Sequence, residues 1–189
     1  IYDRLVGSEM CIRDRIGIAE YIVLGLLDWE INLARMDTHL RQGHWRDGFV
    51  QGAPYHGELH GKRVGFIGYG HIAREAAKRL SPFGMEIWSR TRSPEKCDEH
   101  VHDAAGMDDL ESMLAACRYV VVTCPLTDET RGLVDAAALT TLGPRGVVIN
   151  VARGPVIDEQ ALFEALSSRA IEGATVSYTH LRAHETVVY

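Results

Sequence analysis

The feature that most constrains the fold is a regular alternation of apolar and helical segments from residue 61 onward. Short apolar runs at 63–67 (RVGFI), 86–89 (EIWS), 119–123 (YVVVT) and 146–150 (GVVIN) read as buried strands. Segments with helical periodicity follow them at 72–80, 108–116, 135–142 and 159–166. Strands that alternate with helices pair in parallel, and the helices cover both faces of the sheet. We therefore predict an α/β fold with a doubly wound parallel sheet.

A further helix is expected before the alternation begins. Residues 16–42 place apolar side chains at spacings of three and four, which predicts one leading helix that stops at Gly43. A polar, glycine-containing stretch then leads to the strand–helix core over 61–175. The chain is long enough for one domain of ordinary size and too short for two.

A glycine-rich turn joins the first strand to its helix. It reads G-x-G-x-x-A, with Gly68, Gly70 and Ala73 at the three positions. The first glycine permits a tight turn, the second lets a pyrophosphate approach the backbone, and the small third residue lets helix and strand pack closely. The amides at the helix start, those of His71 and Ile72, are then available to phosphates. In this context the motif predicts a Rossmann-type dinucleotide site, and a merely structural turn is the alternative.

The segment after the second strand favours NADP over NAD. An NAD site usually has Asp or Glu at the end of that strand, about 20 residues after the turn. Here residues 88–93 read WSRTRS, and no carboxylate precedes Glu95. Arginines and hydroxyl groups suit a 2′-phosphate, although a solvated loop is the alternative. The predicted contacts are Ser89, Arg90, Thr91 and Arg92.

Composition narrows the possible partners and the location. Hydrophobic residues make up 46% and charged residues 24% of the chain, as in an ordinary globular domain. The net charge of −6 argues against nucleic acid, and the apolar run 21–27 is far shorter than the ~20 residues of a membrane span. The four cysteines lack ligand spacing, and no signal peptide is recognisable. We expect reduced thiols and a cytoplasmic protein.

The two ends of the chain are related through the genetic code. One choice of codons for residues 5–14 (LVGSEMCIRD) is the reverse complement of codons for residues 176–185 (VSYTHLRAHE). A protein fold gives no reason for this relation, whereas read-through of a sequencing adapter at both ends of a short insert does. We therefore expect residues 1–15 and 176–189 to be foreign, and the natural domain over 16–175 to be truncated at its C-terminal end.

Three motifs resemble those of the D-isomer-specific 2-hydroxyacid dehydrogenases. They are the segments 61–73, 124–130 (CPLTDET) and 150–159 (NVARGPVIDE), in that order, and the resemblance covers essentially all of 16–175. It implies an oxidoreductase that transfers a hydride between a nicotinamide cofactor and a 2-hydroxy or 2-oxo acid such as glyoxylate or hydroxypyruvate. It also implies that the leading helix lies at a homodimer interface.

The resemblance assigns roles to individual residues. Arg153 corresponds to the family's catalytic substrate arginine, whose planar guanidinium can hold a carboxylate and polarise the neighbouring carbonyl. The family uses no metal, so we discount residues 99–103 (EHVHD) as a metal site. The nicotinamide pocket is expected at Cys124, Pro125, Thr130, Val151 and Ala152.

Parts of the family's catalytic apparatus are not expected in this chain. Ser177 stands where the family has an aspartate, and the family's later glutamate and histidine, its acid–base pair, have no counterpart. His180 and Glu185 lie in the segment expected to be foreign. We therefore expect this polypeptide to lack a substrate domain and to be inactive alone. A dinucleotide-sensing, corepressor-like module is the alternative function, and an adenosylhomocysteinase-like enzyme is a third candidate that the NVARG segment disfavours.

Overall fold

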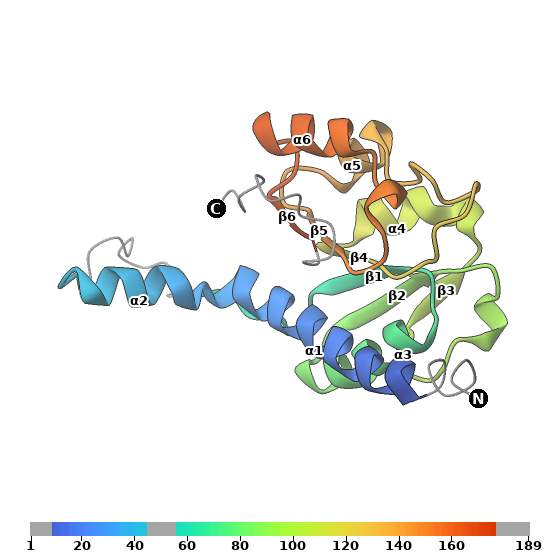
Figure 1. Cartoon of the computed structure of the whole chain (residues 1–189), viewed down its shortest axis with the longest axis horizontal. Coiled ribbons are helices and arrows are strands. Elements are labelled where there is room, and N and C mark those ends of the chain that lie inside the picture. The colour runs from blue at the N-terminus through green and yellow to red at the C-terminus, as the bar shows by residue number, and fades with distance from the viewer. Residues whose placement is uncertain (1–8, 45–55, 177–189) are drawn as a thin grey trace.

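Residues 9–44 and 56–176, which the computed structural model describes, form a parallel sheet with helices on both faces (Figure 1). The strands are β1 (Arg63–Ile67), β2 (Glu86–Arg90), β3 (Asp103–Ala105), β4 (Tyr119–Val122), β5 (Val147–Asn150) and β6 (Gly173–Val176). Their order is β3-β2-β1-β4-β5-β6, and every pair is parallel. This is the strand order of the Rossmann fold and confirms the predicted doubly wound sheet.

Helices on each face cover a separate hydrophobic core. The helices are α1 (Glu9–Ile31), α2 (Leu33–Arg41), α3 (His71–Leu80), α4 (Leu110–Ala116), α5 (Ala136–Leu142) and α6 (Glu159–Ser167). One core lies between the sheet and α1 and α3, and the other lies between the sheet and α4 to α6 (Figure 1). Asp135 and Asp158 accept hydrogen bonds from the third residue of α5 and of α6 and so cap both helices.

The leading segment forms two helices where the sequence predicts one. Asn32 interrupts it with φ 52° and ψ 57°, and its side-chain oxygen accepts a hydrogen bond of 3.1 Å from the Arg35 amide. Asparagine tolerates the left-handed region and is a good helix cap, so the apolar periodicity continues across a real break. The expected boundary at residue 16 falls inside α1. The second helix, α2, has no buried residue and extends away from the sheet (Figure 1).

The C-terminal end of helix α1 packs against β6. The Trp29 indole donates a hydrogen bond of 3.0 Å to the hydroxyl of Thr175. A Cβ on Gly173 would overlap the Trp29 ring, so the helix can approach β6 this closely only because residue 173 is glycine. Ile22 and Leu26 are fully buried in the core beneath the helix. These contacts fix the position of α1 across the sheet.

A buried carboxylate anchors the end of α1 to the amino ends of the central strands. The Glu30 side chain is 5% exposed, and its Oε1 lies 2.5 Å from Lys62 Nζ and 3.6 Å from Arg118 Nε. The hydroxyl of Tyr119, at the start of β4, donates a hydrogen bond to the same oxygen. Burial raises the pKa of Glu30, but the hydrogen bonds and positive charges of these partners outweigh it and lower the pKa overall.

We predict that Glu30→Gln lowers the free energy of unfolding at pH 7 by about 1–3 kcal/mol, because Lys62 loses its counter-charge and Arg118 keeps only its pair with Glu172. The stabilisation by the carboxylate is present above its ordinary pKa of 4.5 and is lost as pH falls through the lowered folded-state pKa. Urea unfolding should therefore show a difference in unfolding free energy between wild type and variant at pH 7 that shrinks as the pH falls below 4.5.

Glu86→Gln is the matched control, since it breaks the exposed 2.7 Å pair between Glu86 and Arg63. Exposed pairs contribute little, so its effect at pH 7 should be clearly smaller. An equal gap between wild type and Glu30→Gln at pH 7 and pH 4 would contradict the proposed linkage.

Candidate functional site

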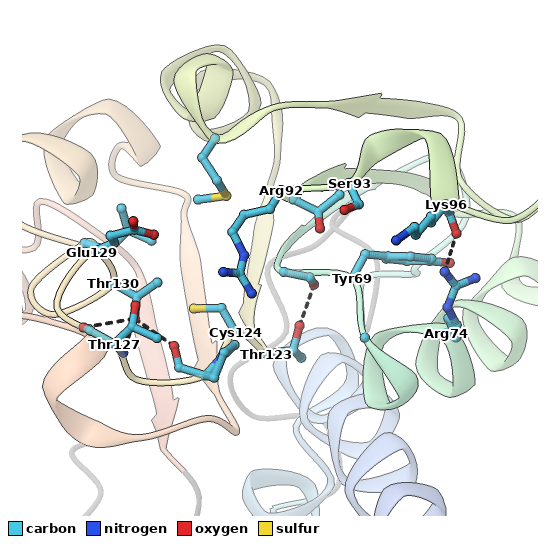
Figure 2. A pocket seen from close by; sticks show the side chains of 16 residues that line it. Tyr69, Arg74, Arg92, Ser93, Lys96, Thr123, Cys124, Thr127, Glu129 and Thr130 are labelled. Carbon is cyan, nitrogen blue, oxygen red and sulfur yellow. Dashed lines mark hydrogen bonds between the residues drawn. The ribbon is translucent and has the colours of Figure 1, made fainter.

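A cleft of about 420 Å³ opens at the carboxyl ends of the strands, beside the point where the strand order reverses between β1 and β4 (Figure 2). Ligands of doubly wound sheets bind at this place. The walls come from the segments that follow β1, β2, β3 and β4. The lining residues are Gly68, Tyr69, Gly70, Arg74, Thr91, Arg92, Ser93, Lys96, Met107, Thr123, Cys124, Pro125, Thr127, Glu129, Thr130 and Leu133.

The turn after β1 is held between the ends of two neighbouring strands. Gly68 donates its amide to the carbonyl of Arg90 at 2.8 Å, and the Thr123 hydroxyl donates to the Gly68 carbonyl at 2.7 Å. Gly68 has φ 87°, and a Cβ there would lie 2.9 Å from the Cα of Cys124. Both the dihedral angle and the available space therefore require glycine.

The second glycine of the turn faces open space at the start of α3. Gly70 has ordinary extended backbone angles, and a Cβ on it would meet no atom within 4 Å. The amides that begin α3, those of His71 and Ile72, have no partners within the helix and carry the positive end of its dipole. A pyrophosphate can approach this backbone directly, and an added methyl group at residue 70 would fill part of that space. The turn thus fits a dinucleotide phosphate.

Cationic side chains surround the cleft. Arg92 is exposed, and Figure 2 shows its side chain extending into the cleft toward Cys124. Arg74 of α3 and Lys96 line the same space, so the described lining carries three cations and one carboxylate, that of Glu129. A concave site with this charge balance attracts phosphate groups.

Arg90, which the sequence analysis expects to contact the cofactor, does not line the cleft. Its side chain is 1% exposed and donates to the Asp109 carboxylate at 2.6 Å and to Asp103 at 3.3 Å. A buried guanidinium needs such partners, and these place it on the face of the sheet that α4 covers. Ser89 is also fully buried outside the lining, while Thr91 and Arg92 line the cleft.

The loop after β4 forms the other wall. Cys124, Pro125 and Thr130, all expected near the nicotinamide, line the cleft. The Thr130 hydroxyl donates to the Pro125 carbonyl at 2.7 Å and accepts from the Thr127 amide at 2.8 Å, which closes the loop on itself. Burial raises the pKa of the Cys124 thiol, so the thiol stays neutral.

Three predicted residues lie beyond β5 and outside the lining. Val151 and Ala152 are buried, whereas Arg153 is exposed and donates to the Ala152 carbonyl at 3.0 Å. The buried amide of Asn150 braces this turn: it accepts from the Ala152 amide at 2.9 Å and donates to the Arg153 carbonyl at 3.2 Å. Asn150 belongs to a motif identified in the sequence, but the sequence did not indicate that its side chain braces this turn.

Several other lining residues were not predicted. Glu129 belongs to the CPLTDET segment, so the motif itself pointed to it. Tyr69 likewise lies inside the 61–73 motif, whereas Arg74 and Lys96 carry no sequence signal, because a charged residue beside a turn is usually solvated. Among the described residues no group of His, Cys, Asp or Glu could hold a metal ion, and no helix there is long and apolar enough to cross a membrane.

Comparison with known sequences connects this geometry to one family. The family model for the NAD-binding domain of D-isomer-specific 2-hydroxyacid dehydrogenases matches residues 23–180. Glyoxylate/hydroxypyruvate reductase A of Arabidopsis thaliana is 34% identical over 181 residues, which cover 93% of this chain and 53% of the relative. Glyoxylate reductase of Thermococcus gammatolerans is 35% identical over 150 residues, 75% of this chain and 43% of the relative. The chain thus spans about half the length of these relatives.

Solved structures show the same fold. A glycerate dehydrogenase-related protein of Thermoplasma acidophilum matches with a TM-score of 0.79 and 26% identity, over 93% of this chain and 59% of that one. A D-isomer-specific 2-hydroxyacid dehydrogenase of Xanthobacter autotrophicus, solved with NADPH, matches with a TM-score of 0.76 and 32% identity, over 92% and 69% of the two chains.

The two glycines of the turn should respond differently to the same substitution. Gly68→Ala should lower the free energy of unfolding by about 1–3 kcal/mol, because the methyl group meets the Cys124 backbone at an unfavourable φ. Gly70→Ala should leave stability nearly unchanged but raise the Kd for NADH and NADPH at least about tenfold, since the methyl group enters the phosphate space. Chemical unfolding and nicotinamide fluorescence titration measure the two effects. Unchanged dinucleotide affinity in Gly70→Ala would show that the phosphate lies elsewhere.

Proposed function

Because the chain belongs to the D-isomer-specific 2-hydroxyacid dehydrogenase family, we propose that it is the cofactor domain of a reductase that uses NADPH to reduce 2-oxo acids such as glyoxylate or hydroxypyruvate. The observation that favours NADPH over NADH is the position of Arg92, whose side chain extends into the cleft directly after β2. Both curated relatives named here are reductases, and neither is a corepressor.

The charges beside β2 support NADPH. The ribose 2′-hydroxyl of NAD is usually held by a carboxylate at the end of this strand, and no lining residue of this segment is acidic. The one acidic side chain of the lining, Glu129, comes from the loop after β4. Arg92, Ser93 and Lys96 instead offer a guanidinium, a hydroxyl and an ammonium group, which suit a phosphate.

Arg153 is the residue that we assign to the substrate. It follows β5 at the carboxyl edge of the sheet, with its backbone held by Asn150. Its exposed guanidinium can bind the carboxylate of a 2-oxo acid and polarise the adjacent carbonyl. The nicotinamide of the bound cofactor supplies the hydride, and the role of Arg153 is to orient the carbonyl carbon and to stabilise negative charge on its oxygen.

We further propose that the complete protein is a homodimer through α1 and α2. Leu24, Leu33 and Leu40 on these helices are 61%, 65% and 49% exposed. Large apolar side chains that stay exposed on consecutive helices are typical of a surface that a partner covers.

Arg92→Ala should weaken NADPH binding at least about tenfold and NADH binding less than about twofold, because only the 2′-phosphate loses a charge-assisted hydrogen bond. Fluorescence titration of the chain with each dinucleotide measures both constants. Arg131→Ala is the matched control, an exposed arginine outside the lining that should change neither. Equal loss for both dinucleotides would argue that Arg92 binds a group common to them.

In the complete reductase, Arg153→Lys should lower kcat/KM for glyoxylate at least about a hundredfold, because an ammonium group cannot reproduce the bidentate, planar contact. The Kd for NADPH should stay within about twofold of wild type, since Arg153 lies outside the cleft lining. Steady-state absorbance of NADPH measures the first and fluorescence titration the second. Wild-type kcat/KM in the variant would remove Arg153 from the reaction.

A further inference from the structure

The carboxylate of Asp98 joins three elements around the cleft. Its Oδ1 accepts a hydrogen bond of 2.8 Å from the hydroxyl of Tyr69, which lies in the glycine turn. Its Oδ2 lies 3.1 Å from Nη1 of Arg74, in the second turn of α3. Asp98 itself belongs to the loop that follows β2. Asp98 therefore ties the loop to the glycine turn and to α3, and its Oδ1 also accepts a hydrogen bond of 3.3 Å from the His100 amide of the same segment.

The same arginine makes two further contacts that close this cluster of Tyr69, Arg74 and Asp98. The second terminal nitrogen of Arg74 donates to the backbone carbonyl of Lys96 (Figure 2). The guanidinium also lies over the Tyr69 ring, 5.1 Å from its centroid. The side chains of Arg74 and Asp98 are 34% and 22% exposed, so solvent screens their ion pair less than a fully exposed one.

The hydrogen bond from Tyr69 to Asp98 holds across the ordinary pH range. Burial, followed by the hydrogen bond to Asp98, raises the pKa of the Tyr69 hydroxyl well above its usual value. The hydroxyl therefore remains protonated and continues to donate.

Most backbone hydrogen bonds of the loop are local. The Thr91 amide donates to the Ala105 carbonyl on β3, but the next backbone bonds run from Lys96 to Ser93 and from Cys97 to Pro94. Such turns keep the loop compact. Cys97 also packs against the core beside α3, and Arg74 donates to the Lys96 carbonyl, whereas Asp98 supplies the link to Tyr69 of the glycine turn. Arg92 and Lys96 lie on this loop, so the cluster sets where their positive charges stand relative to the glycine turn.

We propose that Asp98 is a positioning residue for cofactor selection: it holds the loop over residues 91–98 so that Arg92 and Lys96 meet the 2′-phosphate of NADPH. The inference rests on the proposed NADPH-dependent function. Without the cluster, binding of the 2′-phosphate must also order the loop, and that entropy cost reduces affinity for NADPH. NADH is little affected, because the phosphates that it shares with NADPH bind to the glycine turn and α3.

The direction of the effect separates positioning from simple electrostatics. Removal of a negative charge beside the cleft would by Coulomb's law alone strengthen the binding of a phosphate. Loss of a positioning residue weakens it. Asp98→Ala therefore gives opposite results under the two accounts.

The test is a fluorescence titration of the full chain with NADPH and with NADH. We expect Asp98→Ala to raise the Kd for NADPH about tenfold and the Kd for NADH less than about twofold. Tyr69→Phe removes only one hydroxyl and should raise the ratio of the Kd for NADPH to the Kd for NADH about threefold. The control is Glu75→Gln, which breaks a 2.5 Å ion pair with Arg79 on the same helix away from the cleft, and it should leave the ratio unchanged.

Thermal unfolding without cofactor monitors the fold, and Tyr69→Phe decides the question if Asp98→Ala does not fold. Equal weakening of both dinucleotides, an unchanged ratio, or tighter NADPH binding in Asp98→Ala would each overturn the positioning role while leaving the proposed function intact. A wild-type chain that binds neither dinucleotide would overturn the proposed function and this inference with it.

Discussion

The close approach of the Gly68 backbone to Cys124 fixes the geometry on which the site depends. With φ 87° and no room for a Cβ, Gly68 brings the end of β1 against the segment that follows β4. The chain then turns sharply, so that α3 begins next to the carboxyl edge of the sheet and directs its free amides into the cleft. Neighbouring strands reinforce this turn, because the Arg90 carbonyl and the Thr123 hydroxyl both bond to Gly68. The phosphate-binding geometry is therefore a property of the sheet itself.

Arg90 and Arg92 lie two residues apart, but one is buried and the other exposed, and their surroundings explain the difference. Arg90 is still part of β2, and its side chain points to the face covered by α4, where Asp109 and Asp103 neutralise it. Its removal from water requires those partners, so it serves to join β2 and β3 to α4. Arg92 lies beyond the strand, where the loop lets it turn toward the cleft and keep its charge exposed. Of two arginines two positions apart, one is thus buried in packing and the other stays exposed at the cleft.

Local patterns predicted the parts of the structure that local forces determine. Apolar runs identified the long strands, and the glycine spacing identified the turn, because both follow from short-range geometry. The two edge strands β3 and β6 were not among the predicted strands, since most of their residues are only partly buried or exposed and neither forms a long apolar run. The contact between Tyr69 and Asp98 joins residues far apart in the sequence, and no periodicity indicates such a pair. The burial of Arg90 likewise depends on α4, which the sequence near β2 does not reveal.

The division of the site into a rigid and a less rigid part bears on how cofactor choice can change. In the proposed function, the glycine turn and α3 bind the phosphates that NAD and NADP share, and strand backbones hold this part in place. The same proposal places the loop after β2 at the 2′-phosphate that only NADP carries, and the links of this loop to the turn and to α3 include partly exposed side chains. Side-chain links of this kind contribute little to global stability, so substitutions there can alter selectivity while the sheet stays intact. The proposed function thus places cofactor specificity in the part of the cleft that the fold constrains least.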